Sequence, residues 1–394
     1  MGFLKKSGIA LIAIAGGAAA YDLGTFDRAA WQADYADIKR GMARHYGNLD
    51  WVRHERKLDL VALDQRTTER LDSARSHVEA YLALKDFAGA FGDPHVKLAL
   101  GRDAVSTASA SAVDEPADPP AGADCAAAGY GDEDHGFAPH FAAIPGWRSL
   151  GDGHFPAAIA NGTGFVRIAS FSEQNYAAAC ARAFKPGIGH RALQLATRVE
   201  LQKDLAAAIA KLKAAGAKRV VVDLTGNGGG SEWDVEAATL FTDRTMRRPE
   251  PLLADASCDR MGLWKGERPG CNVFKSEGEI TTLKGAGNWS GPLWVLTAPS
   301  TASAAEEFLG WLKDNGAARQ VGTRTMGAGC GYIDGGRPVV LAAAPLTLRF
   351  PNCARYTAAG RNEIDGWAPD APLPSPESGG EAAWGAKLLA LTGG

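Results

Sequence analysis

Two neighbouring stretches, Pro292-Leu-Trp-Val-Leu-Thr297 and Thr301-Ala-Ser-Ala-Ala-Glu306, decide how this chain folds. The first is short and apolar, which predicts a buried strand. From Ala304 to Asn315 the apolar residues recur at helical spacing. Ser303 is therefore expected at a helix N-terminus, where unpaired N–H groups and the helix dipole favour negative charge. Such a serine is usually only an N-cap, but a nucleophilic serine also needs this setting for the oxyanion that it forms.

The sequence around this stretch alternates between strand and helix patterns. We expect strands at Gly164–Ser170 and Arg219–Leu224, and helices at Glu200–Gly216 and Glu232–Phe241. Strand–helix–strand order implies a parallel-rich sheet with right-handed crossovers. The fold class is therefore α/β, and we place the core of the protein at residues 161–394.

A glycine run, Asp223-Leu-Thr-Gly-Asn-Gly-Gly-Gly230, follows one of these strands. Open α/β sheets place their sites at the carboxyl ends of strands, and glycines there expose N–H groups and let a ligand approach the backbone. The phosphate-binding patterns G-x-x-x-x-G-K-[ST] and G-x-G-x-x-G are absent. A plain tight turn and an oxyanion hole both remain open.

The first half of the chain divides into three parts. Residues 1–20 have two lysines, an apolar stretch and small residues at its end, which predicts a secretory signal peptide too short for a transmembrane span. Residues 21–102 carry helical spacing and predict a small helical domain. Residues 103–160 are poor in large apolar side chains and predict an irregular insert, with a loop or poorly ordered stretch from residue 105 to 131. The mature protein is expected to begin near Tyr21, without a lipid anchor, in the periplasm or outside the cell.

Composition and cysteines agree with an exported globular protein. The chain has 394 residues, 22% of them charged, and a net charge of −3, which gives no reason to expect nucleic acid or a membrane surface as partner. The cysteine count is even and contains no C-x-x-C pair, which favours disulfides. Fifteen connectivities are possible; sequence proximity suggests the pairs Cys125–Cys180, Cys258–Cys271 and Cys330–Cys353.

Four ordered motifs resemble the S41 peptidases, the carboxyl-terminal processing (tail-specific) proteases and the tricorn core. The glycine run resembles that family's D-L-R-x-N-x-G-G element, and Ser303-Ala-Ala-Glu306 resembles its S-A-x-E nucleophile motif. Val321-Gly-Thr-Arg-Thr-Met-Gly327 and Gly366-Trp-Ala-Pro-Asp370 resemble its V-G-x-x-T-x-G and G-v-x-P-D elements. The resemblance covers residues 164–373 and implies a ClpP/crotonase-like fold and a serine peptidase.

Two positions depart from the family pattern. The processing proteases carry a lysine base where this chain has Ala328, and the arginine of D-L-R is replaced by Thr225. The tricorn-like branch uses a histidine and a glutamate instead. At the matching places this chain has His95, in Gly92-Asp-Pro-His95, and Glu363.

The resemblance therefore implies a Ser303–His95–Glu363 triad. A neutral imidazole would take the proton of Ser303 and return it to the leaving amine, while the glutamate would hold the tautomer and stabilise the imidazolium. The N–H groups of Gly228 or Gly229, together with that of Ala304, would bind the oxyanion.

Alternatives to this triad remain open. His154 also reads D-x-H and is a rival base, and Lys97 is a possible displaced base. Glu363 is also compatible with a solvated loop carboxylate. Asp132-Glu-Asp-His135 looks like a hydrophilic loop, so no metal or cofactor is expected.

Three functions fit the sequence. The first is an exported serine peptidase that acts on peptides or proteins and is not inserted in the membrane after signal cleavage. No PDZ-like pattern is visible before the core, so the helical region and the insert would shape access instead. The second is a catalytically inactive binding protein on the same fold, favoured by Ala328 and Thr225. The third is a hydrolase of small esters or acyl groups. Substrate and oligomeric state are left open.

Overall fold

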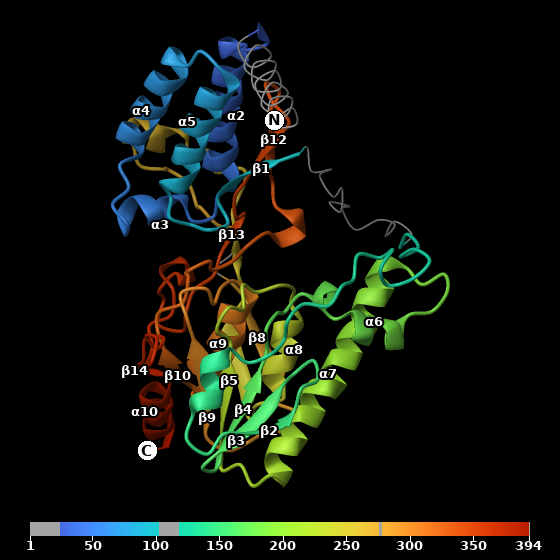
Figure 1. The fold of residues 1–394 in the computed structure, drawn as a ribbon. Helices are drawn as coiled ribbons and strands as arrows, with labels where there is room; N and C mark the ends of the chain where they lie inside the picture. The colour runs from blue at the N-terminus through green and yellow to red at the C-terminus, as the bar shows by residue number, and fades with distance from the viewer. Residues whose placement is uncertain (1–23, 102–117, 276–277, 394) are drawn as a thin grey trace, which may run out of the picture. The chain divides into compact units, whose positions relative to one another are not determined.

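The computed structural model describes residues 24–101, 118–275 and 278–393 (Figure 1). The chain divides into two compact units. The N-terminal unit comprises Met1–Ser109, Leu252–Glu277 and Gly331–Ala354, and the core unit comprises Ala110–Pro251, Gly278–Cys330 and Arg355–Gly394. The predicted signal peptide, residues 1–20, lies outside the described residues, as do residues 102–117 of the predicted insert.

The predicted helical domain is present in the N-terminal unit. Its helices are α2 (Arg28–His45), α3 (Leu49–His54), α4 (Leu60–Ser73) and α5 (His77–Gly89). Asp27, Asp59 and Ser76 cap α2, α4 and α5, because each side chain accepts a hydrogen bond from an N–H of the first turn. The apolar stripe of α2, which includes Trp31 and Ile38, is buried, as its spacing predicts.

Two later segments of the chain complete this unit. Strand β1 (Lys97–Leu100) pairs antiparallel with β12 (Leu346–Arg349), which pairs with β11 (Val339–Val340). Strand β7 (Leu252–Leu253) pairs with β13 (Cys353–Ala354). The buried guanidinium of Arg260 donates to the carbonyls of Ala43 and Tyr46. Residues 252–277 and 331–354 of the expected core from 161 to 394 thus group with the N-terminal helices. Local patterns do not reveal these pairings, because they join segments that lie far apart in the sequence.

The core unit is built on a seven-stranded sheet, as the α/β prediction requires. The strand order is β14-β10-β9-β5-β4-β3-β2. Neighbours from β4 to β14 are parallel, while β2, β3 and β4 are antiparallel. The strands are β2 (Arg148–Gly151), β3 (Ala157–Ala160), β4 (Thr163–Arg167), β5 (Arg219–Asp223), β9 (Leu293–Thr297), β10 (Arg319–Gly322) and β14 (Ala371–Pro372). A separate ribbon pairs β6 (Thr245–Pro249) with β8 (Ile280–Lys284).

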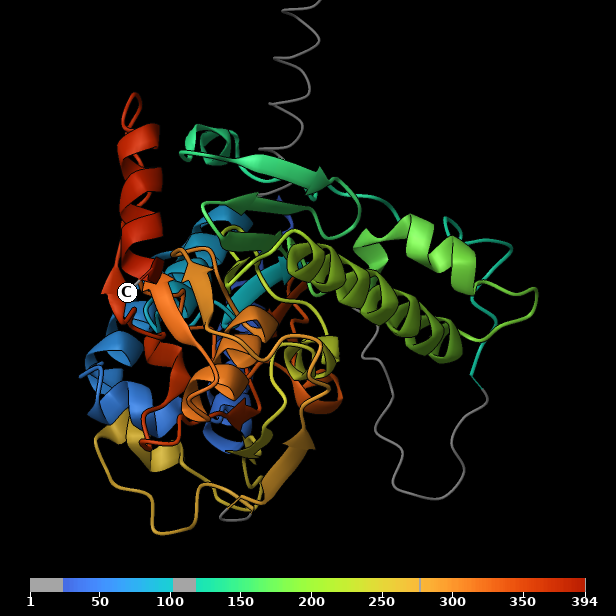
Figure 2. The same ribbon diagram turned by 90° about the horizontal axis from the view of Figure 1, so that it is seen from below.

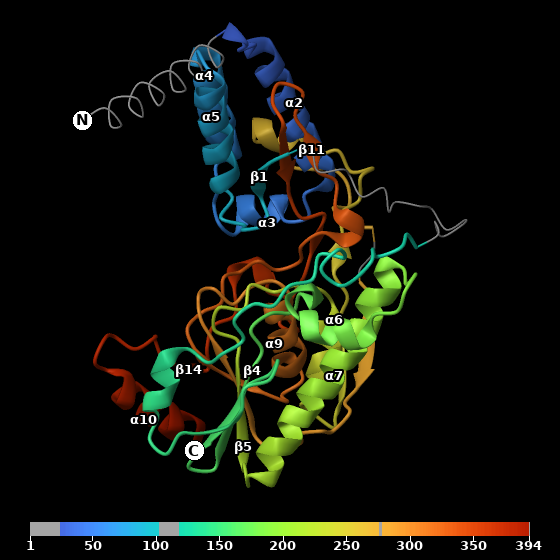
Figure 3. The same ribbon diagram turned by 45° about the vertical axis from the view of Figure 1, so that its right-hand side comes forward.

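Helices cover both faces of this sheet (Figures 2 and 3). Val220 and Val222 of β5 pack with helices α7 (His190–Ala214), α8 (Trp233–Thr239) and α9 (Ala304–Asp314). Val221 points to the opposite face, where it packs with Trp384 of α10 (Glu381–Gly393) and with Phe141. Alternate residues of β5 thus enter two separate clusters, which is the burial expected of a central parallel strand. The short helix α6 (Ala177–Ala183) packs on α7.

The predicted insert contains two strands of the sheet. Strands β2 and β3 fall within residues 103–160, which we expected to be irregular. The reason is composition: β3 reads Ala-Ala-Ile-Ala and is fully buried, but Ile159 is its only β-branched residue, and strands are usually recognised by several of them. From residue 118 to 131 the described chain has no helix or strand, as expected of a loop.

The cysteines form disulfides, as the sequence suggests. Cys125 bonds to Cys180 and Cys258 to Cys271, Cys330 and Cys353 are disulfide-bonded as well, and no described cysteine is free. Within the residues that the structure describes, no helix has both the length and the apolar character needed to cross a membrane. Disulfides in this number favour an oxidising compartment.

Candidate active site

Ser303 lies on a sharp turn between strand β9 and helix α9. Its backbone has φ +56° and ψ −117°, a conformation that costs of order 1–3 kcal/mol for a residue other than glycine. Strain of this kind at a strand-to-helix turn is a feature of the nucleophile elbow of α/β hydrolases, where it exposes the serine at the top of the sheet. The carboxylate of Glu306 accepts the Ser303 N–H at 3.0 Å, so the turn is fixed from within the helix.

Glu306 also holds the segment that follows β10. Its buried carboxylate accepts the Thr325 hydroxyl and the N–H groups of Gly327 and Ala328, the last two at 2.8 Å. Ala328, which stands at the family's lysine position, is 2% exposed. In the described structure, position 328 contacts the Glu306 carboxylate through its backbone N–H, and its alanine side chain offers no amine.

The glycine run lies directly against Ser303. A Cβ atom on Gly229, whose φ is +101°, would come within 2.8 Å of the Ala302 carbonyl oxygen and 2.9 Å of the Ala304 nitrogen. Asn227 ties the two segments together, because its carbonyl oxygen accepts the N–H of Ala302 at 3.0 Å. Only glycine fits at position 229, because the backbone there lies too close to the backbone of Ala302 and Ala304 for a side chain.

The predicted oxyanion-hole donors differ in their availability. The Gly229 N–H donates to the Asn227 side chain at 2.8 Å, so it is already used. For the N–H groups of Gly228 and Ala304, the described residues provide no acceptor. Of the alternatives Gly228 and Gly229, the structure favours Gly228 as the partner of Ala304.

Gly229→Ala is expected to lower kcat by about 10²-fold or more. The new methyl group must displace the Ala304 N–H, and losing one oxyanion donor costs about 10²–10³ in kcat. Steady-state kinetics on a peptide substrate measure the effect. Gly131→Ala is the matched control for bulk, since a Cβ atom at that position of the same unit would meet nothing within 4 Å; comparable losses in both variants would contradict the assignment.

An arginine stands beside Thr225 although the family's D-L-R arginine is missing. Arg167 of β4 pairs with Asp223 at 2.7 Å and donates to the Thr225 carbonyl at 2.9 Å. A guanidinium therefore still holds the start of the glycine run, but it comes from the neighbouring strand. No local sequence signal marks this contact.

Glu363 is buried on the short helical turn η5 (Glu363–Asp365) and is not a solvated loop carboxylate. One of its oxygens accepts the Nε–H of Arg355 at 2.5 Å, and the other pairs with Arg248. Burial, followed by the neighbouring charge of Arg355, lowers the pKa of Arg248 to about 10. Sequence reasoning missed both arginines, because neither lies in a recognisable motif.

His95 belongs to the N-terminal unit, in the turn between α5 and β1. Its N–H donates to Asp93 at 3.0 Å, and its carbonyl accepts the Tyr332 hydroxyl at 2.7 Å. The rings of His95 and Tyr332 lie 5.4 Å apart, edge to face. Asp93 is buried and also accepts the Tyr46 hydroxyl at 2.9 Å. The D-x-H element is thus a rigid turn that holds its histidine by the backbone.

Asp93 makes the stability of this unit depend on pH. Burial raises its pKa to about 6. An acid whose pKa is raised on folding binds its proton more tightly in the folded protein than in the unfolded chain. Its contribution to the free energy of unfolding is therefore fully present below about pH 4 and is lost as pH rises through about 6. The loss amounts to up to about 3 kcal/mol. Asp93→Asn is expected to remove this slope, as measured by urea unfolding at pH 4, 5, 6 and 7. The exposed Asp86→Asn control should keep it; a slope that survives in Asp93→Asn would contradict the assignment.

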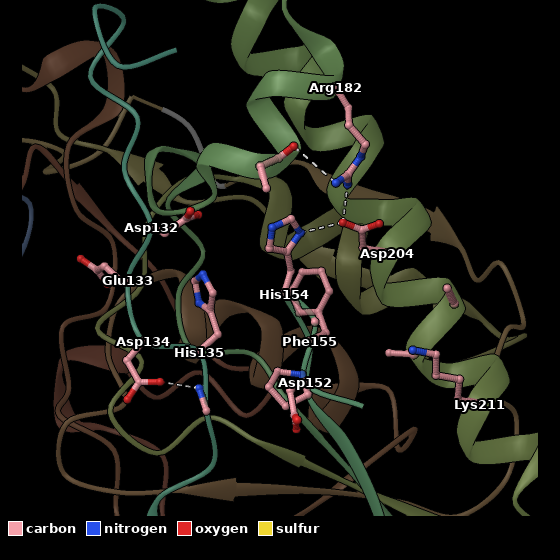
Figure 4. Close-up of a pocket in the computed structure, with 16 residues that line it drawn as sticks. Asp132, Glu133, Asp134, His135, Asp152, His154, Phe155, Arg182, Asp204 and Lys211 are labelled. Carbon is pink, nitrogen blue, oxygen red and sulfur yellow. Dashed lines mark hydrogen bonds and ion pairs between the residues drawn. The ribbon is translucent and has the colours of Figure 1, made fainter. Parts of the chain in front are cut away.

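The rival histidine lies in a pocket of about 690 Å³ in the core unit (Figure 4). Nδ1 of His154 is 2.7 Å from the carboxylate of Asp204, which also pairs with Arg182. His135 stacks on Tyr176 with ring centroids 4.4 Å apart. The residues that line this pocket include neither Ser303 nor the glycine run. His154 is therefore paired with Asp204 in a part of the core unit that is distinct from the serine site.

The acidic stretch from Asp132 to Asp134 lines this pocket, and two of its carboxylates accept backbone N–H groups. Asp132 accepts the N–H of Ala177 at 2.9 Å, and Asp134 accepts that of Gly136 at 2.8 Å. Within the described part of the chain, no three His, Cys, Asp or Glu side chains are grouped so as to hold a metal ion. The interpretation as a hydrophilic loop fits these contacts.

Comparisons with known proteins agree with the four motifs. The model of peptidase family S41 matches residues 162–373. Mature CPAF is similar in structure, with a TM-score of 0.61 and 16% identity, over 92% of this chain and 95% of that one. A putative peptidase from Parabacteroides merdae ATCC 43184 gives a TM-score of 0.59 and 16% identity, over 92% and 96% of the two chains. No curated protein matches the sequence.

An α/β core that presents a strained serine beside a glycine-lined loop is an arrangement shared with the α/β hydrolases. The chain belongs to peptidase family S41.

Proposed function

We propose that this protein is a serine peptidase that hydrolyses peptide bonds through Ser303, with His95 as general base and Glu363 as a buried carboxylate that orients the site. The observation that carries the proposal is the Ser303 turn. It combines a strained backbone with an adjacent loop in which the N–H of Gly228 and that of Ala304 have no partner among the described residues. These features prepare a serine for attack and an oxyanion for binding.

His95 is proposed as the base because lysine is missing from its usual place. The imidazole would accept the Ser303 proton during attack and deliver it to the leaving amine. The rigid turn around Asp93 supports this role, since a base must be held in a fixed geometry. Lys97 lies on strand β1 and His154 is engaged with Asp204, so neither is preferred.

The substrate is proposed to be a peptide or protein outside the cytoplasm. An exported location is supported by the basic and apolar N-terminal sequence and by the disulfides. Such a substrate can bind as an added strand, which would place the scissile carbonyl by main-chain hydrogen bonds.

A fluorophosphonate probe tests the proposal. The folded wild-type protein should become covalently labelled, and peptide mapping should locate the label on Ser303. Ser300→Ala, which changes a neighbouring serine that accepts the Gly226 N–H, should still be labelled. Absence of labelling in a protein with native circular dichroism would refute the proposal.

Absence of labelling would favour the second candidate, an inactive binding protein, for which Ala328 and Thr225 are the supporting observations. Labelling together with hydrolysis of short esters, but of no peptide, would favour an ester or acyl hydrolase.

A further inference from the structure

We propose that Arg355 is a positioning residue for the nucleophile, and that Glu363 acts on Ser303 through Arg355. The inference rests on the proposed function, because it assigns a role within the same site. It concerns contacts inside the core unit only.

One guanidinium joins four parts of the site. Nη2 of Arg355 donates to the Ser303 carbonyl at 3.2 Å and to the Gly329 carbonyl at 3.1 Å. Nε donates to Glu363, and Nη1 pairs with Glu307 in the first turn of α9. The arginine is 4% exposed, so these contacts are made away from water, where charged hydrogen bonds are strong.

The two peptide groups that flank the Cα atom of Ser303 are both held by ionisable side chains. The carboxylate of Glu306 accepts the N–H on one side, and the guanidinium of Arg355 donates to the carbonyl on the other. A strained backbone persists only when its surroundings over-determine it. The pair Glu306 and Arg355 supplies that constraint at φ +56° and ψ −117°.

Glu363 keeps this guanidinium in place. Besides the side-chain pair, the N–H of Glu363 donates to the Arg355 carbonyl at 2.9 Å. Arg248, which is 1% exposed, holds the second oxygen of Glu363 and lies 3.5 Å from Asp314. Removing Glu363 would leave the buried guanidinium groups of Arg355 and Arg248 with less counter-charge, which would cost a large part of the folding free energy. Its carboxylate therefore serves guanidinium groups in the core unit.

The proposal predicts a specific pattern in a double-mutant cycle. Arg355→Met is expected to lower kcat by about 10²-fold with KM little changed, because a misplacement of about 1 Å costs that much. Glu363→Gln should lower kcat by a similar factor. The double variant should lose no more than either single variant, since both act through one contact. Arg355→Lys should recover part of the activity, and the exposed Arg247→Met is the matched control.

The double variant also separates folding from positioning. Arg355→Met alone leaves the Glu363 carboxylate with one partner fewer. In the double variant a neutral amide replaces that carboxylate, and Arg248 keeps Asp314, at 3.5 Å, as its counter-charge. The double variant should show native circular dichroism and remain slow in probe labelling at Ser303. The acid limb of the pH–rate profile should keep its position in all three variants, since the base is unchanged.

Two results would overturn the inference. Wild-type kcat in the folded double variant would show that Arg355 does not position the serine. A shifted acid limb in Glu363→Gln, without the same shift in Arg355→Met, would assign Glu363 to the imidazole. Failure of the proposed function is distinct from both, because the wild-type protein would then take up no probe at all.

Discussion

Ser303→Ala is expected to abolish peptide hydrolysis, with kcat reduced by at least about 10⁴-fold. Removing the nucleophile of a serine peptidase leaves only the contribution of the oxyanion hole and of substrate binding. The backbone contacts of position 303 do not depend on the hydroxyl, because its N–H bonds to Glu306 and its carbonyl to Arg355. The variant should therefore fold as the wild type does, and progress curves with a fluorogenic peptide measure the loss.

Ser303→Gly provides a sharper companion to this variant. It is expected to be equally inactive but more stable than Ser303→Ala by about 1 kcal/mol, because glycine adopts a positive φ without strain. Urea unfolding of the two variants gives the difference. Equal stability of the two would argue that the turn stores no strain, and appreciable hydrolysis by either would remove Ser303 from the mechanism.

His95→Gln is expected to lower kcat/KM by about 10³-fold and to remove the acid limb of the pH–rate profile. Without a base, the serine hydroxyl must lose its proton to water, and positioned general bases contribute about 10²–10⁴ in rate. The backbone contacts of His95 with Asp93 and Tyr332 should survive the change, so the D-x-H turn is kept. The test is the rate of probe labelling at Ser303 as a function of pH.

His154→Gln is the matched control for this experiment. The change removes a contact with Asp204 in the pocket of the core unit, so a small loss of stability is expected with kcat/KM within about threefold of wild type. The opposite pattern, with His154→Gln inactive and His95→Gln active, would move the base to His154. If both variants remain active, a base of another type is required.

Local patterns predicted the parts of the core that depend on neighbours in sequence. Strand β9, helix α9 and the turn between them follow from one apolar run and one change of spacing. The glycine run lies against Ser303 because β5 and β9 are adjacent parallel strands, which the strand–helix–strand order implies. The alanine-rich strand β3 was not predicted, because small side chains give no clear strand pattern in the sequence.

Contacts between distant segments were beyond such patterns. Arg355, Arg248 and Arg167 reach the site from separate elements, and no spacing rule connects an arginine to a serine in a distant part of the chain. The availability of Gly228 rather than Gly229 depends on the rotation of a single side chain, that of Asn227. The return of β12 to pair with β1 is equally non-local.

The sequence by itself determined the α/β class, the family motifs and the serine at the start of α9, because these depend on periodicity and on residue identity within a few turns of chain. Only the tertiary structure decided which N–H groups remain available to an oxyanion and which arginine fixes the strained turn. The physical reason is that hydrogen bonds and buried ion pairs are satisfied by whichever group folding brings within about 3 Å, and that proximity is a property of packing and not of order along the chain.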